Sequence, residues 1–150
     1  KKIFKKLKKI LPKYFGSFPV DKNEVSNAIL SNSKNLKKIV KIVHLEIKKK
    51  IKIFLKKNKN KKIVILDIPL LLENKINKKN DILVFVQSKK LDILKRLRKR
   101  SNFNNRLLSK FKNIQLSLDY KKKKSHFIIK NNFTNKSIKL GIKNILKEVL

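Results

Sequence analysis

The sequence contains no cysteine, no methionine and no tryptophan, and it has only two glycines and three prolines in 150 residues. Without cysteine, neither a disulfide nor a thiolate metal site can form, and a reducing cytoplasm is the default expectation. No apolar run approaches the roughly 20 residues that a membrane-spanning helix needs. The basic start has no signal-peptide core or cleavage pattern. Because methionine is absent, we expect the sequence to be a fragment or a processed product.

Acidic residues are scarce: 9 Asp and Glu stand against 43 Lys and Arg, which gives a formal net charge of +34. Such a charge ordinarily raises nucleic acid or an anionic membrane surface as a partner. Only four of the basic residues are arginines, although arginine is the residue that surfaces reading phosphates and bases prefer. The joint abundance of lysine, asparagine and isoleucine indicates a compositional bias. A basic nucleic-acid-binding module therefore remains the alternative hypothesis, and no specific nucleic acid is expected.

The first 60 residues predict helices. Apolar residues at helical spacing in residues 1–11 stop at Pro12 and indicate a helix that is either docked on the rest or lies on a membrane surface. Asp21 is a candidate N-cap for a second helix, with Glu24 completing a capping box. A long helix is expected over 33–57. Its predicted apolar stripe consists of Leu36, Ile39, Val40, Val43, Ile47, Ile51 and Leu55.

The pattern then changes to short apolar runs that alternate with helical segments. The runs at 62–68 (KIVILDI), 81–87 (DILVFVQ) and 126–131 (HFIIKN) are typical of strands buried on both faces of a parallel sheet. Helices are predicted over 89–100, over 103–118 and over 135–150. The last of these has Ile138, Ile142, Ile145 and Val149 on its apolar face. This alternation predicts a layered α/β fold with a mostly parallel sheet.

Two groups of residues are candidates for chemistry. Asp67 ends the first predicted strand, at the edge of the sheet where α/β folds bind ligands. One interpretation is that Asp67 binds Mg²⁺, directly or through water. The other is that it caps a helix or lies in a surface turn before Pro69. Arg96 and Arg100 are four residues apart and are expected to share a helix face, with Arg98 elsewhere. Arginines so concentrated in a lysine-rich chain either bind phosphate oxygens or form a solvated helix end.

The sequence gives little support for a histidine metal site or for a glycine-rich phosphate-binding loop. His44 and His126 have no partner at ligand spacing, so a structural role is expected for both. The phosphate-binding motif G-x-x-x-x-G-K-[ST] cannot be written anywhere in these residues, because the only glycines are Gly16 and Gly141.

Taken in order, the motifs resemble the second two-thirds of bacterial dephospho-CoA kinase. They are VILDIPLLLEN, NDILVFV, LKRLRKR, SKFKNIQ and SHFIIKNN; the earlier FGSFPVDKNEVSNAIL and LKKIVKIVHLEI fit as well. The resemblance covers the chain from about Phe15 onward. It implies a P-loop-kinase-like three-layer fold that lacks its first strand and its P-loop. It further implies a helical acceptor-side region at about 10–57, a core of sheet and helices at 61–88 and 125–150, and a lid region at 89–118.

The resemblance also assigns roles by position. Asp67 matches the aspartate near the nucleotide and metal site. The cleft wall is implied to contain Pro69, Leu70, Leu71 and Glu73. The ATP and phosphate contacts are implied to be Arg100, Arg96, Lys110 and Asn131, with Arg100 closing over ATP and Asn131 near the adenine.

The sequence departs from the family at several of its motifs. Lys110 stands where the lid helix usually has arginine, which keeps the charge but loses the planar fork. Lys22, Leu45 and the pair Ser125–His126 also differ from the family's usual residues. The P-loop, and the aspartate proposed as base for the accepting hydroxyl, match nothing in these residues.

The implied activity is transfer of the γ-phosphate of ATP, with Mg²⁺, to the ribose 3′-hydroxyl of dephospho-CoA, the last step of coenzyme A synthesis. We expect little or no turnover from these 150 residues alone, and we expect a cytoplasmic monomer without a membrane partner. A kinase of the same superfamily with another small acceptor is a third hypothesis.

Overall fold

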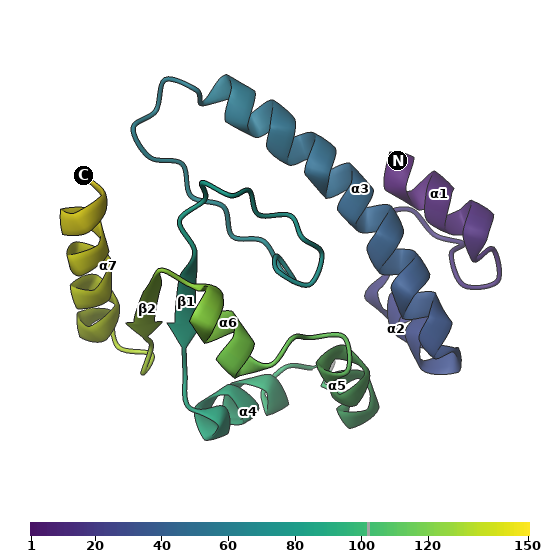
Figure 1. The fold of residues 1–150 in the computed structure, drawn as a ribbon. Helices are drawn as coiled ribbons and strands as arrows, with labels where there is room; N and C mark the ends of the chain where they lie inside the picture. Colours follow the sequence, from purple (N-terminus) through teal and green to yellow (C-terminus); the bar gives the residue numbers. More distant parts are fainter. Residues whose placement is uncertain (102) are drawn as a thin grey trace. The chain divides into compact units, whose positions relative to one another are not determined.

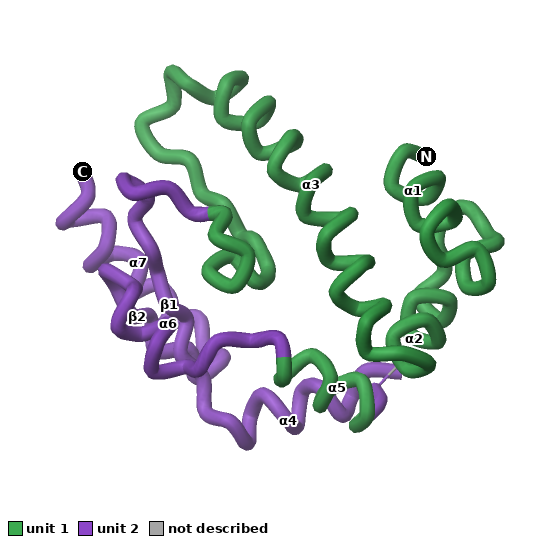
Figure 2. Tube along the Cα trace, turned by 45° about the vertical axis from the view of Figure 1, so that its right-hand side comes forward, with its two compact units in different colours: residues 1–76, 105–113 green, residues 77–104, 114–150 purple. Residues whose placement is uncertain are grey.

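The computed structural model describes residues 1–101 and 103–150, which form seven helices and two strands (Figure 1). In chain order these are α1 (Lys2–Ile10), α2 (Lys22–Ser31), α3 (Ser33–Lys57), β1 (Val84–Gln87), α4 (Lys90–Arg98), α5 (Asn105–Lys112), α6 (Leu118–Lys124), β2 (Phe127–Lys130) and α7 (Asn135–Val149). The chain divides into two compact units (Figure 2): unit 1 comprises residues 1–76 and 105–113, and unit 2 comprises residues 77–104 and 114–150. The combination of helices with a parallel sheet agrees with the predicted α/β fold.

Unit 1 is helical, and local signals set its helix boundaries. α1 ends just before Leu11 and Pro12, as the proline predicts. At the start of α2 the predicted capping box is present: the Asp21 side chain accepts a hydrogen bond from the Asn23 backbone N–H, and Glu24 accepts one from the backbone N–H of Asp21. α3 has the predicted bounds, and the Asn32 side chain caps its first turn by accepting from Lys34 N–H at 2.8 Å.

The core of unit 1 forms where α1 and α2 both pack against α3, along its N-terminal half (Figures 1 and 2). Its buried apolar side chains are Leu7, Leu11, Phe15, Ala28, Ile29, Leu36, Ile39 and Ile42. In the stripe predicted for α3, Leu36 and Ile39 are buried and the other five members are half-buried. Ile42, which the predicted stripe does not include, is buried as well. Helical periodicity identifies an apolar face, but where α1 and α2 lie decides which of its residues are covered.

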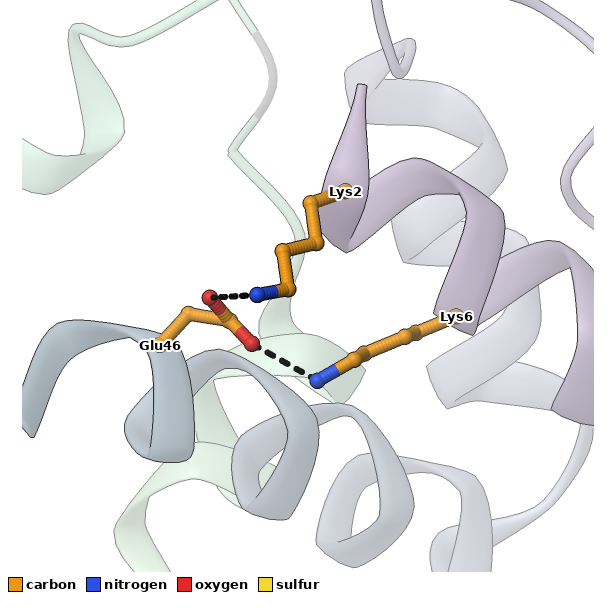
Figure 3. Close-up of polar contacts among 3 residues, drawn as sticks. All are labelled: Lys2, Lys6 and Glu46. Carbon is orange, nitrogen blue, oxygen red and sulfur yellow. Dashed lines mark hydrogen bonds and ion pairs between the residues drawn. The ribbon is translucent and has the colours of Figure 1, made fainter. Parts of the chain in front are cut away.

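Two buried polar side chains complete this core. Asn35 is 6% exposed, and its Nδ2 donates a hydrogen bond to the Ala28 carbonyl at 2.9 Å, which ties the start of α3 to α2. Glu46 is 8% exposed and accepts a hydrogen bond from Lys6 Nζ at 2.6 Å, with Lys2 Nζ at 3.9 Å from its other oxygen (Figure 3). Both of these buried side chains thus have a partner, as burial requires.

Unit 2 is built on a two-stranded parallel sheet. Phe127 pairs with Val84, and the register continues to Lys130 opposite Gln87. These strands confirm the strands predicted at 81–87 and 126–131, in shortened form. The predicted burial on both faces was wrong, because Val84, Val86 and Ile128 are exposed in a sheet of only two described strands. His126 extends the pairing: its backbone N–H donates to the Leu83 carbonyl at 2.8 Å, and its Nδ1 accepts from Leu83 N–H at 2.9 Å. The structural role expected for His126 is confirmed.

α7 packs against β2 through a close approach at Gly141. A Cβ at this position would lie 3.0 Å from Cγ2 of Ile129, the buried residue of β2, so any larger residue would press against the Ile129 side chain. Three residues of the predicted apolar face are half-buried, but Ile142 is 44% exposed and the prediction was wrong for it. Gly141 occupies the contact because it has no side chain to hold the two elements apart.

Two other predicted elements are not formed as expected. Residues 62–68 form no strand, and Ile65 is 84% exposed. A β-branched apolar run indicates a preference for burial, but a strand also needs a hydrogen-bonded neighbour, and in the part of the chain described here only β1 and β2 pair. The helix predicted over 103–118 ends at Lys112. A separate α6 then begins, because the Ser117 side chain caps it by accepting from Tyr120 N–H at 3.2 Å.

Candidate functional site

The segment from Asp67 to Lys75 forms a compact turn in unit 1. Leu70 has φ of 56° and Lys75 has φ of 48°, both in the left-handed region that bulky side chains rarely adopt. The turn is held by Asn74, whose backbone N–H and side-chain Nδ2 both donate to the Leu70 carbonyl, at 3.1 and 2.8 Å. The motif that was predicted to end a strand is therefore a closed turn with its own hydrogen bonds.

The predicted site residues of this turn differ in their exposure. Asp67 and Pro69 are exposed, whereas Leu70, Leu71 and Glu73 are half-buried. Within residues 1–101 and 103–150, no hydrogen bond or ion pair engages the Asp67 carboxylate. The sequence predicted that Asp67 ends a buried strand, and this was wrong, because residues 62–68 form no strand. The Asp67 side chain is exposed, so its oxygens are accessible to a metal-bound water.

In unit 2, Arg96 lies next to the turn that follows β2. Its guanidinium carbon is 4.5 Å from the centroid of the Phe133 ring, a distance at which the cation is attracted to the face of the ring. Phe133 has φ of 64°, and its backbone N–H donates to Asn131 Oδ1 at 2.7 Å. The structure thus brings Arg96, Asn131 and Phe133 together at the carboxyl end of β2.

Asn131 itself continues the sheet. Its backbone N–H donates to the carbonyl of Gln87, the last residue of β1, at 2.7 Å. Asn131 therefore lies at the edge of the sheet where both parallel strands end, which is the edge at which α/β folds bind ligands, and its side chain accepts from the Phe133 backbone N–H there. The sequence predicted Asn131 and Arg96 as candidate site residues, and it did not indicate Phe133. An aromatic residue two positions beyond a predicted strand end, in a chain with few aromatics, was the available signal.

Arg100 does not share a helix face with Arg96, because α4 ends at Arg98. The backbone N–H of Arg100 bonds back to the Leu97 carbonyl at 3.1 Å in a tight final turn, and the side chain is exposed. The spacing of four residues was read as helical, but the helix closes two residues earlier. Arg98 is exposed as well.

Lys110 lies in α5, a helix of unit 1 that packs against α2. The residue is half-buried. The predicted phosphate contacts are thus distributed over both units: Lys110 belongs to unit 1, whereas Arg96, Arg100 and Asn131 belong to unit 2.

Glu24 organises the loop before α2 more extensively than a capping box requires. Its Oε1 accepts hydrogen bonds from the backbone N–H groups of Gly16 at 2.9 Å and Ser17 at 3.0 Å, in addition to the Asp21 bond on its other oxygen. The backbone N–H groups of Ser17 and Gly16 favour the ionised carboxylate and lower the pKa of Glu24 to about 2. The glycine-containing loop is therefore fastened to α2 by one side chain, a feature that the sequence showed only as a cap.

Two further groups in unit 1 have shifted pKa values. The hydrogen bond from Lys6 lowers the pKa of Glu46. Burial, and then the nearby charge of Lys48, lower the pKa of His44, whose Nδ1 is buried with no hydrogen-bond partner. Among the described residues, no cluster of three or more His, Cys, Asp or Glu side chains could hold a metal ion. In the same part of the chain, no helix combines the length and the apolar character needed to cross a membrane.

Comparison with known proteins identifies the family. The sequence profile of dephospho-CoA kinase matches residues 5–137. The dephospho-CoA kinase of Wolbachia pipientis wMel is 30% identical over 129 residues, which cover 85% of this chain and 66% of the relative. That of Rickettsia conorii is 30% identical over 141 residues, which cover 94% of this chain and 72% of the relative. The chain therefore spans about two thirds to three quarters of the length of these relatives, and it belongs to the dephospho-CoA kinase family.

Proposed function

We propose that the chain serves the ATP-dependent phosphorylation of dephospho-CoA at its ribose 3′-hydroxyl, which yields coenzyme A. The observation that carries this proposal is the family match over residues 5–137, which includes the motif from Asp67 to Glu73. In the reaction, the bond between the γ-phosphorus of ATP and its bridging oxygen breaks. A new bond forms to the 3′-oxygen, and ADP and the hydroxyl proton leave.

Arg96 and Arg100 supply the positive charge that a transferring phosphoryl group requires. The contact between Arg96 and the Phe133 ring favours this proposal, because it limits the directions in which the guanidinium can point. Arg100 is exposed just beyond the end of α4, which leaves its planar fork accessible to phosphate oxygens. Lys110 adds a third cation that interacts as a point charge.

Asp67 is the proposed contact for Mg²⁺, through a bound water. The donor chemistry fits, because Mg²⁺ takes oxygen ligands and commonly keeps its waters, and the Asp67 carboxylate is exposed. When bound, the ion would offset the negative charge of the ATP phosphates. The side chains of Pro69, Leu70, Leu71 and Glu73 are proposed to border the substrate cleft, and Asn131 to lie on the adenine side of ATP.

We further propose that these 150 residues show little or no turnover by themselves. They contain no G-x-x-x-x-G-K-[ST] motif to hold the ATP phosphates, and none of them matches the family's proposed base. We also propose that the chain works as a cytoplasmic monomer.

Two measurements on the 150-residue chain test these proposals. Calorimetric titration with dephospho-CoA and with ATP and Mg²⁺ should detect weak binding, which Arg100→Gln and Arg96→Gln reduce and the exposed control Lys61→Gln leaves unchanged. Equal binding by all variants would contradict the assigned contacts. A coupled ATP-consumption assay with dephospho-CoA should stay at background; turnover well above background would overturn the proposed inactivity.

A further inference from the structure

Lysines follow one face of α3 along its whole length. Ten of its 25 residues are lysines, and at 100° per residue eight of them fall within roughly 120° of the helix circumference. We call this set the lysine stripe: Lys34, Lys37, Lys38, Lys41, Lys48, Lys49, Lys52 and Lys56. All eight side chains are exposed. With a rise of 1.5 Å per residue, the stripe extends for roughly 33 Å from Lys34 to Lys56.

No acidic group interrupts the stripe. The single carboxylate of α3, Glu46, is buried on another side of the helix and is held by Lys6 and Lys2 of α1 (Figure 3). None of the eight lysines forms an ion pair within residues 1–101 and 103–150. The lysine stripe is therefore a row of positive charge without a described ion pair, and Lys49 is its member that interacts with the Glu46 charge.

We propose that the lysine stripe binds the phosphate backbone of double-stranded nucleic acid without reading its sequence. A duplex carries one negative charge per roughly 1.7 Å of its axis, and one helical turn of it is roughly 34 to 36 Å long. A straight, rigid row of cations of similar length is complementary to such a backbone. Lysine contributes point charges without the planar fork of arginine, which suits contacts to phosphates rather than to bases.

The surroundings of the stripe distinguish this partner from a lipid surface. A helix that lies on a membrane inserts an apolar face between the headgroups. The N-terminal half of the apolar face of α3 packs against α1 and α2 instead. Within the stripe the exposed apolar residue is Leu45, at 51%, and outside it α3 exposes Ile53 and Phe54 near its C-terminal end. The stripe thus offers charge with little apolar surface, which is the combination that a phosphodiester backbone matches.

This activity is separate from the proposed phosphoryl transfer, because no lysine of the stripe belongs to the proposed kinase site. The compositional bias of the chain explains how many lysines there are. The bias does not explain why eight of the lysines lie on one face of α3, or why Glu46 is paired with Lys6 away from that face. These two features create the positively charged surface.

The test is the salt dependence of binding to a fluorescein-labelled DNA duplex of 20 base pairs, followed by fluorescence anisotropy. The stripe variant carries Lys37→Gln, Lys41→Gln, Lys48→Gln and Lys52→Gln. The matched control carries four exposed lysines outside the stripe, Lys50→Gln, Lys57→Gln, Lys59→Gln and Lys62→Gln, so both variants lose the same charge. A third variant replaces the four stripe lysines with arginine.

If the four substituted lysines contact phosphates, the slope of log K against log salt concentration becomes less steep by about 3 to 4 in the stripe variant, and affinity at about 0.1 M salt falls roughly a hundredfold or more. The control should keep the wild-type slope, and the arginine variant should keep binding. Circular dichroism checks that each variant is folded.

Three results would overturn the proposal. The control could weaken binding as much as the stripe variant, which would assign binding to the total charge. The wild-type chain could fail to bind the duplex at 50 mM salt. It could also bind phosphatidylserine vesicles more tightly than the duplex under the same conditions, which would assign the stripe to lipid.

Discussion

Unit 1 and unit 2 differ in how much of their apolar surface they bury. Eight of the nine buried apolar residues that the structure describes lie in unit 1, and Ile129 is the one in unit 2. Unit 2 instead exposes Val84 and Val86 on one face of its sheet and Ile128 on the other, at 41 to 55%. A helix satisfies its backbone hydrogen bonds internally and needs no neighbouring strand. The three helices α1, α2 and α3 can therefore form a core by packing their apolar faces together. A two-stranded sheet with one covering helix leaves apolar side chains exposed on both faces, so we expect unit 2 to be the less stable unit.

The largest effect should come from removing the centre of unit 1. Phe15 is fully buried, and Phe15→Ala should lower the free energy of unfolding by about 3–5 kcal/mol because it leaves a cavity. Urea unfolding followed by circular dichroism measures the change. The control Phe54→Ala, at a side chain that is 46% exposed, should cost much less. Equal costs for the two variants would contradict the assignment of the core.

In unit 2, the contact between Gly141 and Ile129 predicts that the effect of Gly141→Ala on stability depends on the side chain at position 129. Gly141→Ala should destabilise the unit by about 1–3 kcal/mol, because the new methyl group overlaps the Ile129 side chain. In an Ile129→Ala background the same substitution should stabilise by up to about 1 kcal/mol, since the space is free and alanine favours helices. Hydrogen exchange of the β1 and β2 amides reports on this unit. The same sign in both backgrounds would disprove the contact.

A smaller effect, confined to unit 1, should appear on acidification. The pKa of Glu24 is lowered to about 2 from the ordinary 4.5, so its stabilising hydrogen bonds are fully present above pH 4.5 and are lost as the pH falls towards 2. Amide chemical shifts of Gly16 and Ser17 should titrate in this window in the wild-type chain. Glu24→Gln should remove that titration, whereas Glu148→Gln, an exposed change of the same charge, should leave it intact.

The smallest effects concern the two lysines that face Glu46. Lys6→Met should destabilise unit 1 measurably, because it removes a 2.6 Å hydrogen bond from a carboxylate that is almost buried. Lys2→Met should have almost no effect, since the Lys2 side chain is 67% exposed and its nitrogen is 3.9 Å from the carboxylate. Thermal unfolding of the two variants in parallel measures the difference, and the reverse order would contradict the geometry.

The sequence predicted what is decided locally. The bounds of α3 and the capping box of α2 follow from helical periodicity and from side chains within four residues, and both are confirmed. Residues 62–68 show the limit, because an apolar run cannot indicate which segment will pair with it. The contact of Arg96 with Phe133 joins residues 37 positions apart in the chain, and no local pattern reports it. The roles assigned to Asp67, Arg100, Lys110 and Asn131 stay predictions.

The three backbone bonds of Glu24 mean that the loop at residues 16–21 and the start of α2 share a single fastening point. The conformational entropy of the loop is therefore removed when the helix forms. A small molecule that recognises this loop would meet it already in order, and its affinity would not be reduced by the cost of arranging it. A substitution at Glu24 should consequently change the mobility of the loop before it changes the content of helix.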